Sequence, residues 1–286
     1  MKLEATIVGV VLLAALMHAT WNAVVKSDSD RLISFALVQA TGMIGGALLL
    51  LAAGSIADES WPYLIGSTVI HYVYYFLLLR AYAHGDLSHV YPIARGLGPL
   101  LVALFSGSLI GEHLSSAELA GVLAVSIGVT SLAFARGLPR GADLRATAFA
   151  LMTGVTIASY TILDGLGVRA SGNALGYIAW LNALEGPGVM IVALVRRPWP
   201  VLAAYLRTQW WRGCAGGAIA ATGYGISIWA MGQGPVAHVA ALRETSVLFA
   251  AIIGLVFLRE SFGLWRISAA ALIVAGLLLM HLHIGG

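Results

Sequence analysis

Ten apolar segments, each long enough to cross a lipid bilayer, follow one another along the chain with short polar breaks between them. A transmembrane helix needs about 20 mainly apolar residues. The segments are continuously apolar and lack the two-residue alternation of a barrel strand, so we expect helices. We therefore predict an all-α integral membrane protein. Its ten predicted spans are 5–26, 32–55, 62–83, 89–110, 116–135, 145–166, 174–195, 212–232, 236–258 and 264–282.

The composition excludes several classes of protein. Only 10% of the residues are charged, against about 25% in a soluble domain, which argues against a soluble enzyme or a nucleic-acid binder. A single cysteine, Cys214, excludes a disulfide framework, an iron–sulfur cluster and a thiolate zinc site. We expect no cofactor and no metal, and membrane lipid and a small-molecule substrate as partners. The first span is too long for a cleaved signal peptide, and no small-residue cleavage site follows it.

The basic residues predict how the chain is oriented. Twelve of the 16 lysines and arginines fall on one side of the predicted spans, two on the other and two inside spans. Because lysine and arginine are enriched in cytoplasmic loops, loop 135–145 is predicted to be cytoplasmic and both termini to lie outside, in a bacterial inner (plasma) membrane. The twelve are Lys26, Arg31, Arg80, Arg136, Arg140, Arg145, Arg196, Arg197, Arg207, Arg212, Arg259 and Arg266.

The chain divides into two halves of five spans each. Residues 1–135 form the first predicted repeat, 136–144 a cytoplasmic linker and 145–286 the second repeat, together making one domain. Because five is odd, the second repeat must enter the membrane in the opposite sense. Inverted repeats of this kind recur in transporters whose binding site lies between the halves near the bilayer midplane.

Short sequence matches support the repeat. Residues 85–90 read GDLSHV and 234–239 read GPVAHV, each just before the fourth span of its half. One arginine follows each segment, and a dipeptide that ends in glutamate closes each fourth span. The corresponding residues are Arg95 and Arg243, then Gly111-Glu112 and Arg259-Glu260, with Ala19-Thr20-Trp21 and Ala158-Ser159-Tyr160 in the first spans.

Ten spans in two fused halves, with Gly111-Glu112 or Arg259-Glu260 after each fourth span, resemble the EamA-type members of the drug/metabolite transporter superfamily. The resemblance covers the whole chain and is nearest to the neutral and aromatic amino-acid exporters. It implies transport, often export, of small metabolites through a cavity between the halves. It supplies no residue signature for one substrate.

Four ionisable side chains, Arg95, Glu185, Arg243 and Glu244, lie well inside predicted spans. Each costs about 2.5 kcal/mol or more in lipid, so each needs a partner or a cavity. Arg95 is expected either to bind a substrate carboxylate or to pair with Glu185 or with backbone carbonyls. Arg243 is expected to mirror Arg95 across the repeat. Glu185 and Glu244 are candidates for charge pairing, for proton coupling or for binding a substrate ammonium.

Glycine and proline predict weak points in two helices. Gly98-Pro99 follows Arg95 in the fourth span, and Gly186-Pro187 follows Glu185 in the seventh. Proline removes a backbone donor and clashes with the carbonyl four residues earlier. We therefore predict that both spans are kinked or partly unwound beside the charged residues.

Aromatic residues with polar tips suit a cavity that is apolar yet forms hydrogen bonds. For about half of them, ordinary packing or an interfacial belt is the alternative. The predicted substrate-binding set is His18, Trp21, Asn22, His71, Tyr75, Tyr91, Arg95, Tyr160, Trp180, Tyr224, Trp229 and Arg243.

The residues favour a secondary transporter with alternating access, exporting neutral or aromatic amino acids. Phosphorylated or nucleotide-linked sugars are the alternative substrates. A membrane-embedded enzyme is the alternative class, but none of the common hydrolase or metalloprotease motifs occurs, so we predict no enzyme. The sequence is consistent with energy coupling by proton antiport and with facilitated diffusion. It does not indicate the oligomeric state.

Overall fold

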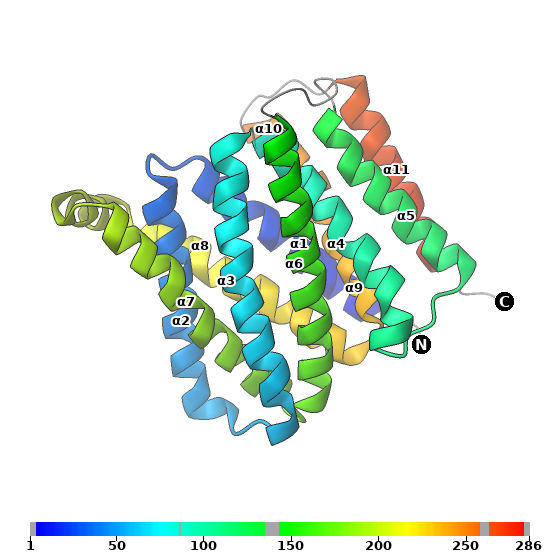
Figure 1. The fold of residues 1–286 in the computed structure, drawn as a ribbon, viewed down its shortest axis with the longest axis horizontal. Helices are drawn as coiled ribbons and strands as arrows, with labels where there is room; N and C mark the ends of the chain where they lie inside the picture. Colours follow the sequence, from blue (N-terminus) through cyan, green and yellow to red (C-terminus); the bar gives the residue numbers. More distant parts are fainter. Residues whose placement is uncertain (1–3, 86, 135–142, 258–262, 283–286) are drawn as a thin grey trace.

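A computed structural model describes residues 4–85, 87–134, 143–257 and 263–282 (Figure 1). The described residues form helices and short connections, with no strand among them. Two short 3-10 helices, Asp58–Ser60 and Leu132–Phe134, accompany the α-helices. The α-helices are α1 (Ala5–Lys26), α2 (Arg31–Ala53), α3 (Trp61–His84), α4 (Leu87–Leu109), α5 (Ser116–Ser131), α6 (Asp143–Ala170), α7 (Ala174–Arg196), α8 (Trp199–Gln233), α9 (Val236–Arg243), α10 (Thr245–Phe257) and α11 (Leu264–Leu282).

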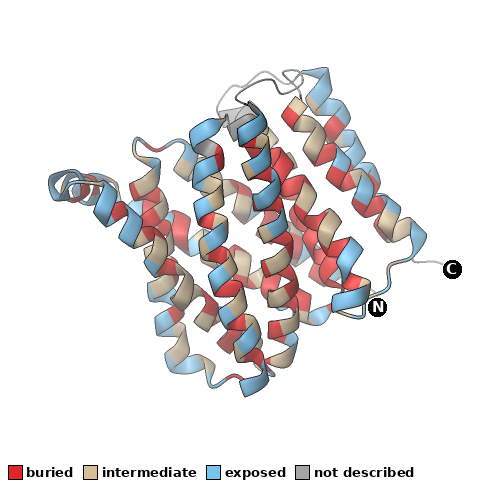
Figure 2. Ribbon diagram, in the orientation of Figure 1, coloured by how far each residue is buried: buried red, intermediate tan, exposed pale blue. Residues whose placement is uncertain are grey.

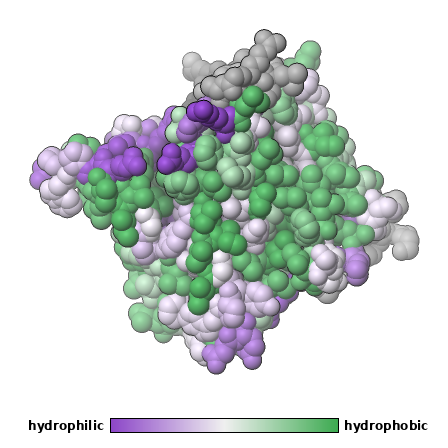
Figure 3. All heavy atoms as spheres, viewed as in Figure 1, coloured by the Kyte–Doolittle hydropathy of each residue, from purple (hydrophilic) through white to green (hydrophobic). Residues whose placement is uncertain are grey.

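The outer surface is built for lipid. Within the described residues, 9 helical stretches are long and apolar enough to cross a membrane, and Leu264–Met280 adds a shorter apolar helix. Large apolar side chains point outward, such as Leu51 at 86% and Val195 at 77% exposure. On the face drawn in Figure 3, apolar residues cover the middle and hydrophilic residues gather at the upper left and the bottom. The prediction of an all-α membrane protein is confirmed.

Helix packing has the symmetry of two repeats. Helices α2 and α7 pack together, as do α5 and α11, and each pair lies side by side in Figure 1. The contact of α3 with α6 is matched by that of α8 with α1, and the contact of α4 with α6 by that of α10 with α1. Exchanging the halves therefore leaves this set of packed pairs unchanged. Buried residues follow the inward faces of the helices (Figure 2).

Two predicted spans differ from the observed helices. Helix α8 begins at Trp199 rather than at residue 212, because its first turns contain arginines and tryptophans that lower the hydropathy but remain helical. The ninth span is divided at Glu244, where the backbone hydrogen bonds join residues three apart instead of four apart. The Glu244 N–H bonds the carbonyl of Ala241, three residues back, and the Val247 N–H bonds the carbonyl of Glu244. Such 3-10 bonds often mark a local change in a helix.

The predicted unwinding at Gly98-Pro99 and Gly186-Pro187 is wrong. Helix α4 continues through Pro99 and α7 through Pro187. The glycines instead permit close approach between helices. A Cβ at Gly98 would lie 2.7 Å from Ile157 Cγ2 of α6, and one at Gly186 would lie 2.5 Å from Met43 Cβ of α2. Tertiary packing thus holds the helical conformation that proline weakens.

The end of the bundle at residues 26–31, 85 and 197 is called the basic side here. Asp30 ties α2 to α7 there, accepting the N–H groups of Leu32 and Ile33 at 3.1 and 3.2 Å and Arg197 Nε at 2.6 Å. Burial alone raises the pKa of the Asp30 carboxyl, but the hydrogen bonds from Arg197, Ile33 and Leu32 outweigh it. They hold this pKa below its ordinary value of 3.8.

This lowered pKa predicts a pH-dependent contribution to stability. The stabilisation is present above about pH 4 and is lost as the pH falls through the lowered pKa. Asp30→Ala is expected to cost about 1 kcal/mol at pH 7, mainly through the lost helix cap, because the half-exposed ion pair adds little. Thermal melting of the purified protein in detergent measures the difference in stability between Asp30→Ala and wild type. A difference that is the same at pH 3 as at pH 7 would contradict the lowered pKa of Asp30.

Candidate functional site

A cavity of about 830 Å³ lies between the two halves and is lined by residues of both. This volume is in the range of small-molecule binding sites. The cavity reaches the basic side, where Lys26, Asp28, Ser29, Asp30 and Arg31 line it. The described connections on the opposite side, 54–57, 110–115, 171–173 and 234–235, contribute nothing to its lining. The cavity is therefore accessible from one side of the bundle.

Arg95 and Glu244 form a buried ion pair beside the cavity. Arg95 Nε donates to Glu244 Oε2 at 3.1 Å, and Arg95 Nη2 lies 2.8 Å from Oε1. The two residues are 5% and 2% exposed. A guanidinium held by a carboxylate through two nitrogens is among the strongest charge pairs in proteins. The expected pairing of Arg95 with Glu185 is therefore wrong, and the positive charge of Arg95 is already neutralised.

The repeat explains this pair. Arg95 and Glu244 are 149 residues apart, the same separation as His89 from His238 in the matched segments. The two charges therefore occupy equivalent positions in the two halves. The sequence prediction placed Arg243 opposite Arg95 and was one residue out.

Arg243 is a different kind of cation. It is 7% exposed and lines the cavity. Its guanidinium carbon lies 4.9 Å from the centre of the Tyr224 ring. Among the described residues no carboxylate forms an ion pair with it. A buried cation is expensive without a counterion, so this guanidinium is a place where an anionic group of a ligand would bind.

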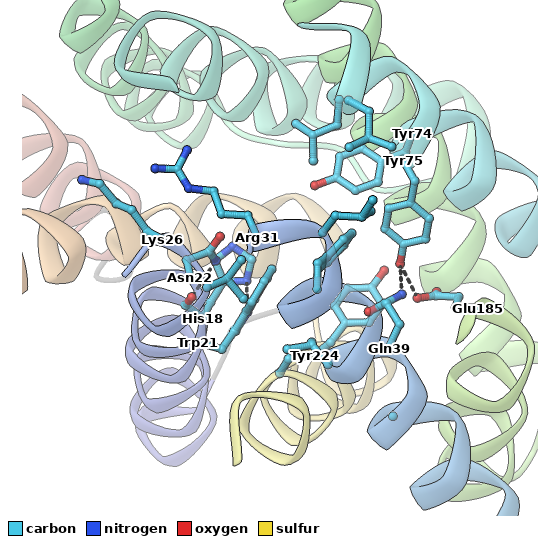
Figure 4. A pocket seen from close by; sticks show the side chains of 18 of the residues that line it. His18, Trp21, Asn22, Lys26, Arg31, Gln39, Tyr74, Tyr75, Glu185 and Tyr224 are labelled. Atoms are coloured by element: carbon cyan, nitrogen blue, oxygen red, sulfur yellow. Dashed lines mark hydrogen bonds between the residues drawn. The ribbon is translucent and has the colours of Figure 1, made fainter. Parts of the chain in front are cut away.

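Glu185 is the carboxylate of the cavity. Tyr75 Oη donates to Glu185 Oε2 at 3.1 Å, and Gln39 Nε2 donates to Tyr75 Oη at 2.7 Å, as Figure 4 shows. His71 Nδ1 lies 3.3 Å from Glu185 Oε1. Within the described part of the chain, no lysine or arginine pairs with Glu185. Its position suits a ligand cation.

Aromatic rings form much of the remaining wall. Trp21 stacks on Phe35 with ring centres 6.1 Å apart, and His71 stacks on Tyr160 at 4.0 Å. On the α1 side, Trp21 Nε1 donates to His18 Nδ1 at 3.3 Å (Figure 4). These rings give the cavity flat apolar surfaces with hydrogen-bonding edges. The predicted residues that line it are His18, Trp21, Asn22, His71, Tyr75, Tyr91, Arg95, Tyr160, Glu185, Tyr224 and Arg243.

Two predicted binding residues lie away from this cavity. Trp180 packs against Trp61 with ring centres 5.1 Å apart, and Trp229 is 36% exposed on the outer surface. Both were assigned from residue type alone, which does not reveal the helix face. Glu244 lies behind Arg95 and does not line the cavity.

The sequence analysis missed Gln39 and Asp164. Glutamine is common in loops and carries no charge to mark it. Asp164 stood two residues from the end of a span predicted to stop at 166, whereas α6 continues to Ala170. The sequence did contain a signal for Asp164, because a carboxylate within an apolar helix is costly in lipid and indicates a partner or a functional site.

A polar cluster joins several helices on the side opposite the basic side. Arg169 Nη2 lies 2.5 Å from Glu112 Oε1 and donates to the carbonyl of Gly234 at 2.7 Å. Arg169 Nε donates to the carbonyl of Met231 at 3.0 Å. Glu112 also accepts the N–H of Val236 at 2.9 Å. These five residues, called the closing cluster below, join the α4–α5 connection to α6, α8 and α9.

The structure offers no metal centre in the residues it describes: no group of three or more histidine, cysteine, aspartate or glutamate side chains is placed to hold an ion.

Comparison with protein families decides the identity. The model of the EamA-like transporter family matches residues 5–134 and 144–282. The chain belongs to the EamA-like transporter family. Such proteins are membrane transporters of small molecules rather than enzymes. The two matches fit the two-repeat arrangement. Most of the predicted linker 136–144 lies outside the described residues, as do Arg259 and Glu260.

Solved structures agree on the fold of this EamA-like transporter, with 29 chains matching. One, described only as "Crystal structure of protein", has a TM-score of 0.77 and 20% sequence identity, over 98% of each chain. At that identity the likeness shows the fold alone. A search of the curated proteins gave no match.

Proposed function

We propose that this transporter exports neutral and aromatic amino acids by alternating access through the cavity between its halves. The observation that carries the proposal is a pair of opposite charges on the wall of one aromatic cavity: among the described residues, no carboxylate pairs with Arg243 and no lysine or arginine pairs with Glu185. An amino acid has a carboxylate for Arg243 and an ammonium for Glu185. Its side chain would pack among rings such as Trp21, Phe35 and Tyr160.

Phosphorylated sugars fit less well. A phosphate group carries about two negative charges and favours clustered cations. Arg95 is neutralised by Glu244, which leaves Arg243 as the cation without an ionic partner deep in the described cavity wall. Lys26, Arg31 and Arg197 lie at the mouth, and Arg197 is paired with Asp30. A zwitterion matches this charge balance better than a dianion.

The basic side is taken as cytoplasmic, following the positive-inside rule. The structure is then open to the cytoplasm, with the closing cluster sealing the outer side. Export would follow when the halves rock, opening that cluster and closing the basic side. Both termini lie outside in this orientation.

The test is uptake of labelled leucine and phenylalanine by proteoliposomes that contain the purified protein. We expect saturable uptake that is competed by neutral amino acids and not by glucose 6-phosphate or UDP-glucose. Arg243→Gln should reduce uptake at least about tenfold, the equivalent of 1.4 kcal/mol of binding. Arg207→Gln, at an exposed arginine of α8, is the matched control and should leave uptake unchanged. Competition by sugar phosphates alone would contradict the proposal.

A further inference from the structure

Asp164 is a buried carboxylate that the substrate site, as described, does not use. It lies on α6 and is 0% exposed. Tyr177 Oη donates to its Oδ1 at 3.1 Å, and Tyr224 Oη donates to its Oδ2 at 2.5 Å. A Cβ at Gly167 would lie 2.5 Å from Tyr177 Oη, so the missing side chain gives this hydroxyl room to reach Asp164. Each carboxylate oxygen thus accepts a hydroxyl from a different helix, α7 or α8.

Tyr224 is the side chain through which Asp164 reaches the cavity (Figure 4). Its hydroxyl bonds the carboxylate, while its ring belongs to the cavity wall. The rings of His71 and Tyr160 meet it edge to face, with ring centres 5.8 and 6.2 Å away. These contacts set the plane of the Tyr224 ring, and the hydrogen bond to Asp164 fixes the position of its hydroxyl end.

The Arg243 guanidinium lies over the ring that Asp164 holds. Its guanidinium carbon is 4.9 Å from the centre of the Tyr224 ring. The face of an aromatic ring carries partial negative charge and attracts a cation placed over it. A hydroxyl that donates to a carboxylate is polarised by that carboxylate, which makes its ring more electron-rich. Asp164 therefore acts on Arg243 by fixing the ring and by strengthening the attraction of the ring face.

We propose that Asp164 and Tyr224 are positioning residues for the substrate carboxylate. The assignment rests on the proposed function, in which that carboxylate binds Arg243. Asp164 acts from behind the wall, since it does not line the cavity. It holds Tyr224, and Tyr224 keeps the guanidinium in place before a substrate arrives. Ordering a long side chain costs free energy when a ligand binds, so a guanidinium that is already fixed binds a carboxylate more tightly.

This arrangement predicts which part of a ligand depends on Tyr224. Glu185 accepts its hydrogen bond from Tyr75 and lies beside His71, so recognition of an ammonium group does not pass through Tyr224. Phenethylamine has the ring and the ammonium of phenylalanine but no carboxylate. It should be insensitive to loss of the hydrogen bond between Asp164 and Tyr224. General damage to the cavity would weaken the binding of both compounds.

Competition against labelled leucine measures both compounds in proteoliposomes. The selectivity ratio is the concentration of phenethylamine that halves leucine uptake, divided by the concentration of phenylalanine that does so. In wild type we expect a ratio of at least about ten, because the carboxylate of phenylalanine binds Arg243. Tyr224→Phe keeps the ring and changes no charge. It should lower the ratio at least about fivefold, with phenethylamine within about twofold of wild type.

Two further variants test the assignment. Asp164→Glu keeps the charge but displaces the carboxylate by one methylene group, and it should lower the selectivity ratio as Tyr224→Phe does. Tyr205→Phe is the matched control. Tyr205 lies on the same helix as Tyr224 and donates to Asp28, but it does not line the cavity. Its loss of a hydroxyl should leave the ratio unchanged.

A double-mutant cycle separates positioning from direct contact. If Tyr224 acts through Arg243, Tyr224→Phe should have no further effect on phenylalanine in the Arg243→Gln background. If the hydroxyl bound substrate itself, its loss would weaken phenylalanine in that background too. Where a variant transports too slowly to measure, the thermal stabilisation of the purified protein by each compound replaces the uptake measurement.

The outcomes distinguish this proposal from the proposed function. A wild-type ratio near one shows that the carboxylate is not recognised, and it refutes the proposed function itself. A high wild-type ratio that Tyr224→Phe or a folded Asp164→Glu retains overturns the positioning role and leaves the proposed function intact. Equal weakening of both compounds in Tyr224→Phe means a merely structural role and also overturns it. If Asp164→Glu does not fold, Tyr224→Phe and the cycle decide.

Discussion

Arg95→Ala is expected to abolish transport and to lower the free energy of unfolding by about 3–5 kcal/mol, the usual cost of leaving one partner of a buried ion pair uncompensated. Glu244, 2% exposed, would keep its carboxylate next to an empty volume. The pair also joins α4 of one half to the α9–α10 junction of the other, so its loss loosens the contact between the repeats. Thermal melting in detergent and uptake in proteoliposomes measure the two effects.

The double variant Arg95→Met/Glu244→Leu is the control for this explanation. Replacing both charges with apolar side chains removes the uncompensated carboxylate, and such replacements are often neutral. It should therefore melt closer to wild type than Arg95→Ala does. If the single variant melts at the wild-type temperature, the pair contributes nothing to the fold and the explanation is wrong.

The second large effect is expected in the closing cluster. Arg169→Gln removes an ion pair with Glu112 and weakens two hydrogen bonds to carbonyls of α8 and its connection. Hydrogen bonds to charged groups contribute about 1.5–3 kcal/mol each, so the closed outer side should lose at least about tenfold in population. The protein should open toward the side opposite the basic side.

Cysteine labelling measures this opening. Cys214 is the sole cysteine of the sequence, and Cys214→Ala provides a clean background. Ala237, fully buried just beyond the cluster on α9, is replaced with cysteine and exposed to a membrane-impermeant maleimide. Arg169→Gln should accelerate labelling about tenfold, while Arg207→Gln should have no effect. Equal rates in all three proteins would show that the cluster does not hold the outer side closed.

Much of the fold could be predicted from the sequence, because lipid demands long apolar helices and each leaves a plain signal. The limits of α1 were predicted to the residue, and most others within a few. The extension of α8 to Trp199 was not, because a helix can continue beyond the bilayer with charged residues in it. The break at Glu244 was missed because no glycine or proline stands near it in the sequence of this span.

The candidate site was harder to predict, because pairing is a property of the folded chain. Arg95, Glu185, Arg243 and Glu244 were identified as costly in lipid, yet their partners were not. The matched histidines could have predicted the pairing of Arg95 with Glu244. The shift of 149 residues that aligns His89 with His238 also aligns Arg95 with Glu244. Trp180 is an example of a wrong prediction from residue type. Its aromatic ring suited a cavity, but its side chain packs against Trp61 instead.

The central claim is that substrate binds in the cavity between the halves and enters it from the basic side. Asn22 lines that cavity on α1 and donates to the carbonyl of His18 at 2.7 Å. Asn22→Cys in the Cys214→Ala background is labelled with a membrane-impermeant maleimide in vesicles of each orientation, with and without phenylalanine. We predict labelling from the cytoplasmic face that phenylalanine slows and glucose 6-phosphate does not. Labelling that no transported amino acid slows, or that occurs only from outside, would contradict the account.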